Sequence, residues 1–362
     1  MAKVVTGTDR RLIEAGFPCH QVGAETQRER DTGKAPPTHR LHVWWARRPL
    51  TPSRAAILAS LLPAGTDPDW FLRQLGIEKV QAMVNGEPWT LTGPLREQVQ
   101  REGLEEWLVI DDKVMKALEA EEKRREKNRR VIQKLSSADP QLANHPVVLR
   151  WERESQPLPK PWLLGGRLPV RRVAADPAHV NERIEFRKSD RVRKVLGPDF
   201  SWDKEDLYGY ERAYGSHPVP VQEGLTVFDP TAGGGSIPFE ALRLGTKVIV
   251  NDLNPVACVI LNATLDYPVR YGPDLATDVE KWGNLLVRTL DDKLGRVFPD
   301  HSPLPEYERM LLQNHLKGSV EQQWEFDRDE VVDYLYCRQV TCPHCGGEAP
   351  LLNTCWLSKE GE

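Results

Sequence analysis

The sequence predicts an α/β fold built around a short parallel sheet, and the stretch 221–270 carries that prediction. Two short apolar runs, LTVFD and KVIVND, have the pattern of buried strands, and each ends on an acid, Asp229 or Asp252. Between them a glycine-rich loop leads into the helical pattern SIPFEALRL, which ends at Gly245. A second helical pattern, NPVACVILNATLDYP, follows. This order of strand, loop, helix, strand and helix begins an α/β sheet with parallel strands.

Residues 1–63 precede this core as a separate N-terminal segment. The stretch TDRRLIEAG predicts a short helix, and the polar stretch after it, HQVGAETQRERDTGKAPPTHR, predicts extended chain. LHVWWARRPLTPSRAAILASLLP then predicts a helix with Thr51 as N-cap, Pro52 in its first turn and Pro63 after its end.

Residues 64–220 have the character of an insertion of mixed helical and irregular structure. EEWLVIDDKVMKALEAEEKRREKNRRVIQKLSS predicts a helix whose charged middle projects into water. The proline-rich stretch HPVVLRWERESQPLPKPWLLGGRLPVRR predicts loops and short strands. Beyond the core, 271–330 is expected to be mainly helical, and 331–362 to hold a hairpin around a Cys-x-x-Cys turn.

Composition limits the classes of protein that fit. The chain has 362 residues, a net charge of -4 and six cysteines, which are scattered except near the C-terminus. An apolar run of about 18 residues, as a membrane span needs, does not occur, and the N-terminus has no secretory signal. We therefore expect a cytoplasmic protein without a disulfide framework. DNA binding would need local basic faces, for which the clusters at 123–130 and 187–194 are candidates.

The glycine loop matches neither the dinucleotide fingerprint G-x-G-x-x-G nor the P-loop. An acid opens it, which suits a cationic group such as an α-amino group. The carboxylate of Asp252, at the tip of the next strand, can accept hydrogen bonds from both hydroxyls of a ribose. An amino acid and a ribose on neighbouring strand tips describe S-adenosylmethionine. The predicted cofactor site comprises Asp229, Pro230, Thr231, Ala232, Gly233, Gly234, Gly235, Asp252, Leu253 and Asn254.

This spacing resembles the first two motifs of class I S-adenosylmethionine-dependent methyltransferases, and DPTAGGGSIPFEA resembles the form found in enzymes that methylate amino groups of nucleic acids. The segment IEAGFP…ETQRERDTGKAPPTHRLHVWWARRPLTPSRAAILASLLP closely resembles the N-terminal domain of unknown function of large adenine-specific DNA methyltransferases. The resemblance covers roughly 10–63, 221–270 and 335–358. It implies a partial class I methyltransferase sheet, Rossmann-like, interrupted by the insertion.

By the same resemblance, the aromatic and basic segment before the helix closes the cofactor pocket. Indole faces can cover an adenine or a methyl-sulfonium cation. The alternative is that the tryptophans are core and the arginines are surface. The implied lining residues are His42, Trp44, Trp45, Arg48 and Pro49.

The family's catalytic motif [DNS]-P-P-[YFW] does not occur in the sequence, and neither do the later strands of the sheet. The resemblance therefore implies the cofactor-binding subunit of a split DNA methyltransferase, with adenine N6 as target and a second polypeptide completing the sheet. Such enzymes commonly belong to restriction-modification or phage-defence systems. The alternatives are a non-catalytic, cofactor-sensing or DNA-binding scaffold, and a component of an RNA methyltransferase.

The terminal cysteines predict a zinc site. Cys342-Pro-His-Cys345 has the spacing of a zinc-knuckle turn. Cys337 and Cys355 can complete a tetrahedral thiolate site. Two alternatives remain open: a partner chain supplies the second pair, or the pair is reduced and free of metal.

Overall fold

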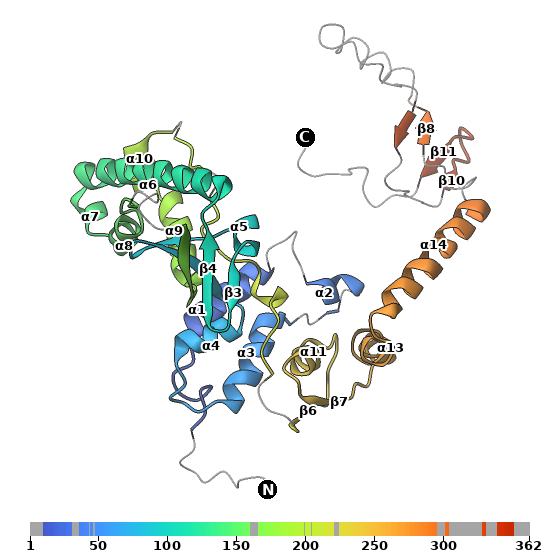
Figure 1. Cartoon of the computed structure of the whole chain (residues 1–362). Coiled ribbons are helices and arrows are strands. Elements are labelled where there is room, and N and C mark those ends of the chain that lie inside the picture. The colour runs from blue at the N-terminus through green and yellow to red at the C-terminus, as the bar shows by residue number, and fades with distance from the viewer. Residues whose placement is uncertain are drawn as a thin grey trace. The chain divides into compact units, whose positions relative to one another are not determined.

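The computed structural model describes residues 10–30, 36–42, 44–45, 48–159, 166–198, 200–203, 205–220, 224–294, 301–303, 328–330 and 339–350. The chain is mixed α/β, as the sequence predicted, and divides into two compact units, Met1–Arg270 and Tyr271–Glu362 (Figure 1). The candidate cofactor residues all lie in the first unit.

The helices of the first unit are α1 (Cys19–Arg30), α2 (Pro37–Leu41), α3 (Leu50–Leu61), α4 (Pro68–Gln74), α5 (Pro94–Glu97), α6 (Asp112–Ala138), α7 (Pro140–Ala143), α8 (Pro146–Glu154), α9 (Pro177–Lys188), α10 (Asp190–Leu196), the 3₁₀ turn η2 (Ala213–Gly215), α11 (Ser236–Arg243), α12 (Pro255–Leu261), the π-helical turn η3 (Asn262–Asp266) and α13 (Tyr267–Tyr271), whose last residue already belongs to the second unit. Its strands are β1 (Glu78–Val84), β2 (Glu87–Thr90), β3 (Gln100–Glu102), β4 (Glu105–Val109), β5 (Arg167–Ala174), β6 (Thr226–Asp229) and β7 (Lys247–Val250).

The largest sheet in the described residues is antiparallel, with strand order β2-β1-β5-β4-β3. Its first hairpin turns on Asn85 and Gly86, which both have positive φ, as hairpins with a two-residue turn require. Strand β5 lies between β1 and β4, so Val80 is opposite Arg172 and Leu108 is opposite Leu168. This sheet occupies the stretch for which the sequence predicted only helix, loops and short strands.

Two apolar clusters stabilise this part of the chain. One lies on a face of the sheet, where Val80, Ala82 and Leu108 pack against Val114 and Leu118 at the start of α6. The other cluster is formed by apolar side chains from the end of α6 and from α7, α8, α9 and α10, and Trp151 lies buried among them. The long helix α6 therefore has an apolar stripe at each end.

The charged middle of α6 projects into water on one side, as its sequence predicted, where Glu126, Lys127 and Arg130 are exposed, but its other side is covered by the rest of the chain. Arg125 is buried, pairs with Glu121, and donates hydrogen bonds to the carbonyl oxygens of Gln156 and Pro88. The free energy that burial of a guanidinium costs is offset here by neutral acceptors and one carboxylate. The sequence did not predict the covered side, because these partners lie about 30 or more residues away along the chain.

Helix α1 forms where the sequence predicted extended polar chain. The carboxylate of Glu25 accepts hydrogen bonds from the Tyr210 hydroxyl and the backbone N–H of Ala213, and Arg28 stacks on the Tyr208 ring at 3.8 Å. The polar face of α1 is thus buried against residues 208–213. A hydrophobicity pattern does not reveal such a helix, because its buried face is ionic.

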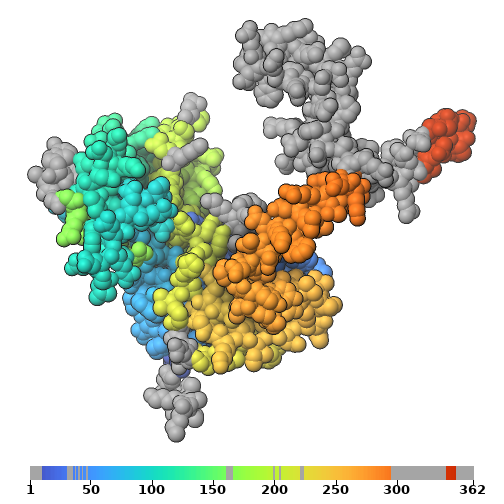
Figure 2. All heavy atoms as spheres, turned by 45° about the vertical axis from the view of Figure 1, so that its right-hand side comes forward, coloured from blue at the N-terminus to red at the C-terminus, as the bar shows by residue number. Residues whose placement is uncertain are grey.

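Strands β6 and β7 form a parallel pair, with Asp229 opposite Val250. Helix α11 contacts both strands, and it packs against α3 through the fully buried ion pair between Arg54 Nε and Glu240 Oε2, 2.6 Å apart. Figure 2 shows the blue atoms of the N-terminal segment beside the yellow atoms of this region. The predicted strand-loop-helix-strand-helix order is present, but a complete Rossmann-like sheet is not shown, since the described parallel strands number two.

The second unit contains α14 (Asp274–Leu294) and four short strands, β8 (His301–Pro303), β9 (Arg328–Glu330), β10 (Gln339–Thr341) and β11 (Glu348–Pro350). Strands β8 and β9 pair antiparallel, as do β10 and β11, which flank the Cys-x-x-Cys turn. Among the described helices, none has both the length and the apolarity that a membrane crossing requires.

Candidate functional site

Backbone hydrogen bonds join the tips of β6 and β7 without any ligand. Asn251 N–H donates to the carbonyl oxygen of Asp229 at 3.0 Å, and Ala232 N–H donates to the carbonyl oxygen of Asn251 at 3.1 Å. The glycine loop therefore folds back over the end of the neighbouring strand. Both acids lie at this carboxyl end of the pair, where ligands bind in α/β sheets.

The carboxylate of Asp252 is fixed by two backbone donors. Its Oδ2 accepts from Gly233 N–H and its Oδ1 from Asn254 N–H, both at 2.8 Å. Hydrogen bonds from Asn254 and Gly233 lower the pKa of Asp252, so the group is ionised at neutral pH. Each carboxylate oxygen has a further acceptor site, so two ribose hydroxyls can still be accommodated.

The glycines of the loop have distinct structural roles. Gly233 and Gly235 have φ of 53° and 80°, in the left-handed region. A Cβ on Gly233 would lie 2.6 Å from Nε1 of Trp44, and one on Gly235 would lie 3.0 Å from Cδ2 of Leu261. A side chain at either position would therefore strain the backbone and displace a neighbouring side chain.

The structure brings Trp44 against the glycine loop, although about 190 residues separate them in the sequence. A second contact holds the same segment in place: the Ser236 hydroxyl, at the start of α11, donates to the carbonyl oxygen of Arg48 at 2.7 Å. The rings of Trp44 and Trp45 are 5.3 Å apart. Of the other implied lining residues, Pro49 is buried, His42 and Arg48 are exposed, and Trp45 is 87% exposed.

Helix α3, which follows this segment, begins in a way that the sequence did not reveal. Its N-cap is Pro49 rather than Thr51. The carboxylate of Glu29 in α1 accepts hydrogen bonds from the N–H groups of Leu50 at 2.5 Å and Thr51 at 2.9 Å. A negative charge at a helix N-terminus is favourable, so Glu29 replaces the side-chain cap. No local spacing rule identifies such a cap from another helix.

The remaining residues of the predicted loop are placed as follows. Asp229 Oδ1 accepts from Thr231 N–H at 3.2 Å, and the Asn251 side chain donates to the carbonyl oxygen of Pro230. Asn254 caps α12 by accepting from Val256 N–H at 2.9 Å. Leu253 is 97% exposed. The chain around Asp252 is therefore ordered by its own hydrogen bonds while its apolar neighbour faces outward.

The Cys-x-x-Cys turn has the geometry of a ligand-holding turn. Cys342 N–H donates to Gly347 at 2.8 Å, and Gly346 N–H donates back to Cys342 at 2.9 Å. Backbone hydrogen bonds from Cys345 and His344 lower the pKa of the Cys342 thiol, which favours the thiolate that zinc binds. Cys337 and Cys355 lie outside the described residues, and within the described part of the chain no group of three or more candidate ligands is found together.

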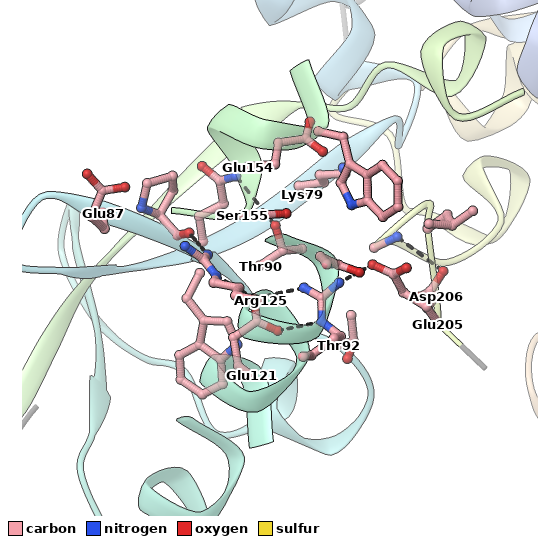
Figure 3. A pocket seen from close by; sticks show the side chains of 18 of the residues that line it. Lys79, Glu87, Thr90, Thr92, Glu121, Arg125, Glu154, Ser155, Glu205 and Asp206 are labelled. Carbon is pink, nitrogen blue, oxygen red and sulfur yellow. Dashed lines mark hydrogen bonds and ion pairs between the residues drawn. The ribbon is translucent and has the colours of Figure 1, made fainter. Parts of the chain in front are cut away.

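A polar cavity of about 420 Å³ lies beside strand β2, in the stretch that sequence reasoning treated as an insertion. Its residues come from β1, β2, the chain after β2, α5, α6, α8, α9 and the chain at 205–209 (Figure 3). No short motif joins these segments, so the sequence offered no signal for it.

Comparison with known proteins gives one match. Residues 16–83 match the model of a family described as "Protein of unknown function (DUF1156)". No curated protein and no solved structure matches the chain. The matched stretch runs from before α1 into β1 and contains Trp44, Glu29 and α3, which hold the segment against the glycine loop. In this stretch the chain is therefore similar to a domain of unknown function.

Proposed function

We propose that this chain is the S-adenosylmethionine-binding subunit of a split DNA methyltransferase that methylates an amino group, with adenine N6 as its target. The observation that supports this best is the arrangement at the tips of β6 and β7. Asp229 and Asp252 stand on neighbouring strands, with a glycine loop bonded to Asp252 and Trp44 packed against that loop.

The donors and acceptors at this site suit the cofactor. S-adenosylmethionine would supply an electrophilic methyl group. The carboxylate of Asp252 is ionised and is oriented by two N–H groups, so it can accept hydrogen bonds from the ribose hydroxyls. Asp229 attracts the α-amino group, and the indole of Trp44 forms an apolar wall beside the loop. In such a transfer the methyl group would move from sulfur to the acceptor nitrogen as the carbon–sulfur bond breaks, and the amino group would release a proton to solvent.

The exposed face of the β6–β7 pair supports the need for a second polypeptide. Phe228 and Ile249, on the face opposite α11, are 61% and 56% exposed. Parallel sheets are normally covered on both faces. A partner that adds strands to this pair and a helix to this face would bury these side chains and bring groups that hold the acceptor nitrogen in line with the methyl group.

The basic clusters contribute unequally to a DNA-binding face. In α6, Arg124 and Arg125 are occupied by Glu121, and Arg129 pairs with Glu122. On α10, Arg193 and Lys194 are exposed. We therefore propose α10 rather than α6 as a contact to phosphates.

The cofactor part of the proposal is tested by calorimetry with S-adenosylhomocysteine and the full chain. Asp252→Ala should weaken binding by about 1–3 kcal/mol, because the ribose hydroxyls lose a charged acceptor. Asp278→Ala, which removes an exposed carboxylate of α14, is the matched control and should bind like wild type. Equal affinities of wild type and Asp252→Ala would remove Asp252 from the site.

The enzyme part is tested with labelled S-adenosylmethionine and DNA. The 362-residue chain alone should transfer no methyl group, and adding a polypeptide that carries [DNS]-P-P-[YFW] and forms a complex with the chain should restore transfer. Methylation by the chain alone would contradict the split enzyme. A stable complex that binds cofactor but never methylates DNA would favour the scaffold alternative, and transfer to RNA only would favour the RNA alternative.

We also propose that Cys342 and Cys345 hold zinc together with Cys337 and Cys355. Elemental analysis of the full chain should find about one zinc per chain, and Cys342→Ser should remove it. Cys258→Ser, which replaces an exposed free cysteine of α12, is the control and should keep the metal. Full zinc content in Cys342→Ser would exclude this site.

A further inference from the structure

Helix α14 of the second unit has an apolar stripe that the structure leaves exposed. Figure 1 shows α14 as one continuous helix. Val279, Trp282, Leu286 and Leu290 recur along it every three or four residues, so they lie on one side of the helix. These four side chains, which we call the α14 stripe, are between 44% and 63% exposed. A row of large exposed apolar side chains of this kind marks a contact surface for another protein.

The polar side chains at the edges of the stripe are mainly acidic. Helical periodicity puts Asp278 one turn before Trp282, and Asp291 one turn after Val287. The exposed acids of the helix are Asp274, Asp278, Glu280, Asp291 and Asp292. Among the described residues, none of these five carboxylates forms an ion pair, so their charges are not neutralised by neighbouring bases.

The three bases of α14 do not offset these acids along the edges. Arg288 lies on the side of the helix opposite Leu286. Lys281 lies with its ammonium group 5.5 Å from the centre of the Trp282 ring, and Lys293 is in the last turn, where a cation suits the helix C-terminus. With five acids and three bases the helix has a net charge of -2, and acids prevail beside the stripe.

The stripe alone is too small to hold a second copy of the chain. With 21 residues, α14 is about 30 Å long. Pairing with one more helix, over a width of about 10 Å, buries on the order of 300 Å² per partner, whereas stable complexes bury about 800 Å² per partner. A second copy would also bring like charges together. The stripe therefore suits a basic partner that is held by further contacts elsewhere.

We propose that the α14 stripe binds an amphipathic helix with basic edges, and that this helix belongs to the polypeptide that completes the methyltransferase sheet. The inference rests on the proposed function, because that polypeptide would also cover the exposed face of β6–β7 and so supply the additional interface. Apolar side chains of its helix pack around Trp282 and Leu286. Its lysine or arginine side chains pair with acids such as Asp278 and Asp291.

The test is calorimetry of the full chain with three synthetic peptides of the length of α14, 21 residues. The first has a helical stripe of leucines with lysines beside it. The second has glutamates in place of the lysines, and the third has the composition of the first in an order without a stripe. The first peptide should bind about tenfold or more tightly than either of the others. Its affinity should fall as the salt concentration rises, because exposed charges contribute to binding.

The variants place the binding on the stripe. Leu286→Ser should weaken binding of the lysine peptide by about tenfold or more. Leu149→Ser, at an exposed leucine of α8, is the matched control and should bind like wild type. The double variant Asp278→Lys, Asp291→Lys should reverse the order of the lysine and glutamate peptides. Circular dichroism of each variant reports whether its helices are retained.

Four results would overturn the proposal. These are equal affinity for the striped and the reordered peptide, equal affinity for the lysine and the glutamate peptide, an unchanged affinity in Leu286→Ser, and a dimer of the chain alone that Leu286→Ser dissociates in sedimentation experiments. The last result would assign the stripe to a second copy.

Failure of this inference and failure of the proposed function give different results. Leu286→Ser should bind S-adenosylhomocysteine like wild type, because the cofactor residues lie in the other unit. A chain that methylates DNA together with a second polypeptide, but binds none of the peptides, would contradict this inference alone. A chain that binds the lysine peptide through the stripe, but binds no cofactor, would contradict the proposed function and keep the helix-binding face.

Discussion

The two sheets of the first unit differ in how completely the chain covers them. The antiparallel sheet β2-β1-β5-β4-β3 packs Ala82 and Leu108 into a closed apolar cluster against α6. The parallel pair β6–β7 has α11 on one face, while Phe228 and Ile249 of its other face stay largely exposed. The stretch that forms the antiparallel sheet has no recognisable motif, but it covers its own apolar face. Among the described residues, the stretch with the clearest motif leaves one face of its strand pair uncovered, because the acids and glycines from which we propose a ligand site do not form a core.

The largest effect is expected where the two regions meet. Arg54 of α3 is fully buried, pairs with Glu240 of α11, and donates to the Leu75 carbonyl and the Ser216 hydroxyl. Arg54→Ala should lower the free energy of unfolding by about 3–5 kcal/mol, since it leaves a buried carboxylate without one of its partners. Arg130→Ala removes an exposed pair with Glu126 and should cost about 0.5 kcal/mol or less. Urea unfolding measures both, and similar costs would contradict the burial of Arg54.

Truncating one apolar side chain in each sheet tests whether the two sheets differ in how far the chain covers them. Leu108→Ala removes a buried side chain of β4 and should destabilise the isolated chain by about 2–5 kcal/mol. Ile249→Ala removes an exposed one of β7 and should change stability by about 0.5 kcal/mol or less, while weakening association with the partner. A large loss of stability in Ile249→Ala would show that this chain covers the β6–β7 face itself.

A substitution in the cavity beside β2 should instead raise the free energy of unfolding. Burial lowers the pKa of Lys79 below its unfolded value, so the folded state disfavours the charged form. Stability should therefore rise as pH increases through the folded-state pKa towards the unfolded value. Lys79→Met should stabilise the chain by about 0.5–2 kcal/mol, because it removes a positive charge whose burial costs free energy. Thermal unfolding at several pH values measures this, and a destabilised variant would mean that Lys79 has a structural partner.

The smallest effect is expected at the start of α3. The Thr51 hydroxyl is buried and finds no partner in the described residues, because Glu29 caps the helix instead. Thr51→Val should change the free energy of unfolding by about 0.5 kcal/mol or less, and towards greater stability. A loss of about 1 kcal/mol in thermal unfolding would restore Thr51 as the N-cap.

Local signals in the sequence predicted the β6-loop-α11-β7-α12 order, because apolar runs, glycines and caps act within a few residues of each other. They did not predict the antiparallel sheet, because β5 pairs with β1 across a long stretch of chain and register is decided by the fold. The Asn85-Gly86 turn between two strands was a usable signal for its first hairpin. Helix α1 was missed because its buried residues, Glu25 and Glu29, are polar and their partners are distant.

In the candidate site, too, local features could be predicted from the sequence and long-range contacts could not. The acids and glycines were predicted from spacing, and the nearness of Trp44 to the loop came from resemblance alone. The hydrogen bond from Gly233 to Asp252 could not be predicted, since it depends on how the loop folds back over β7. The cavity beside β2 draws its lining from helices, strands and loops that are far apart in the sequence, so only the folded chain brings Lys79 and Arg183 to one cavity.

The ion pair between Arg54 and Glu240 also sets an order of events during protein synthesis. The two residues are 186 positions apart. At about 5–20 residues per second, the ribosome needs roughly 10–40 s to make the acid after the base. Throughout that interval the N-terminal helices cannot reach their final packing, because Arg54 must keep its charge in water. The segment that carries Arg54, although it is made before α11, is therefore among the last to be locked into the fold.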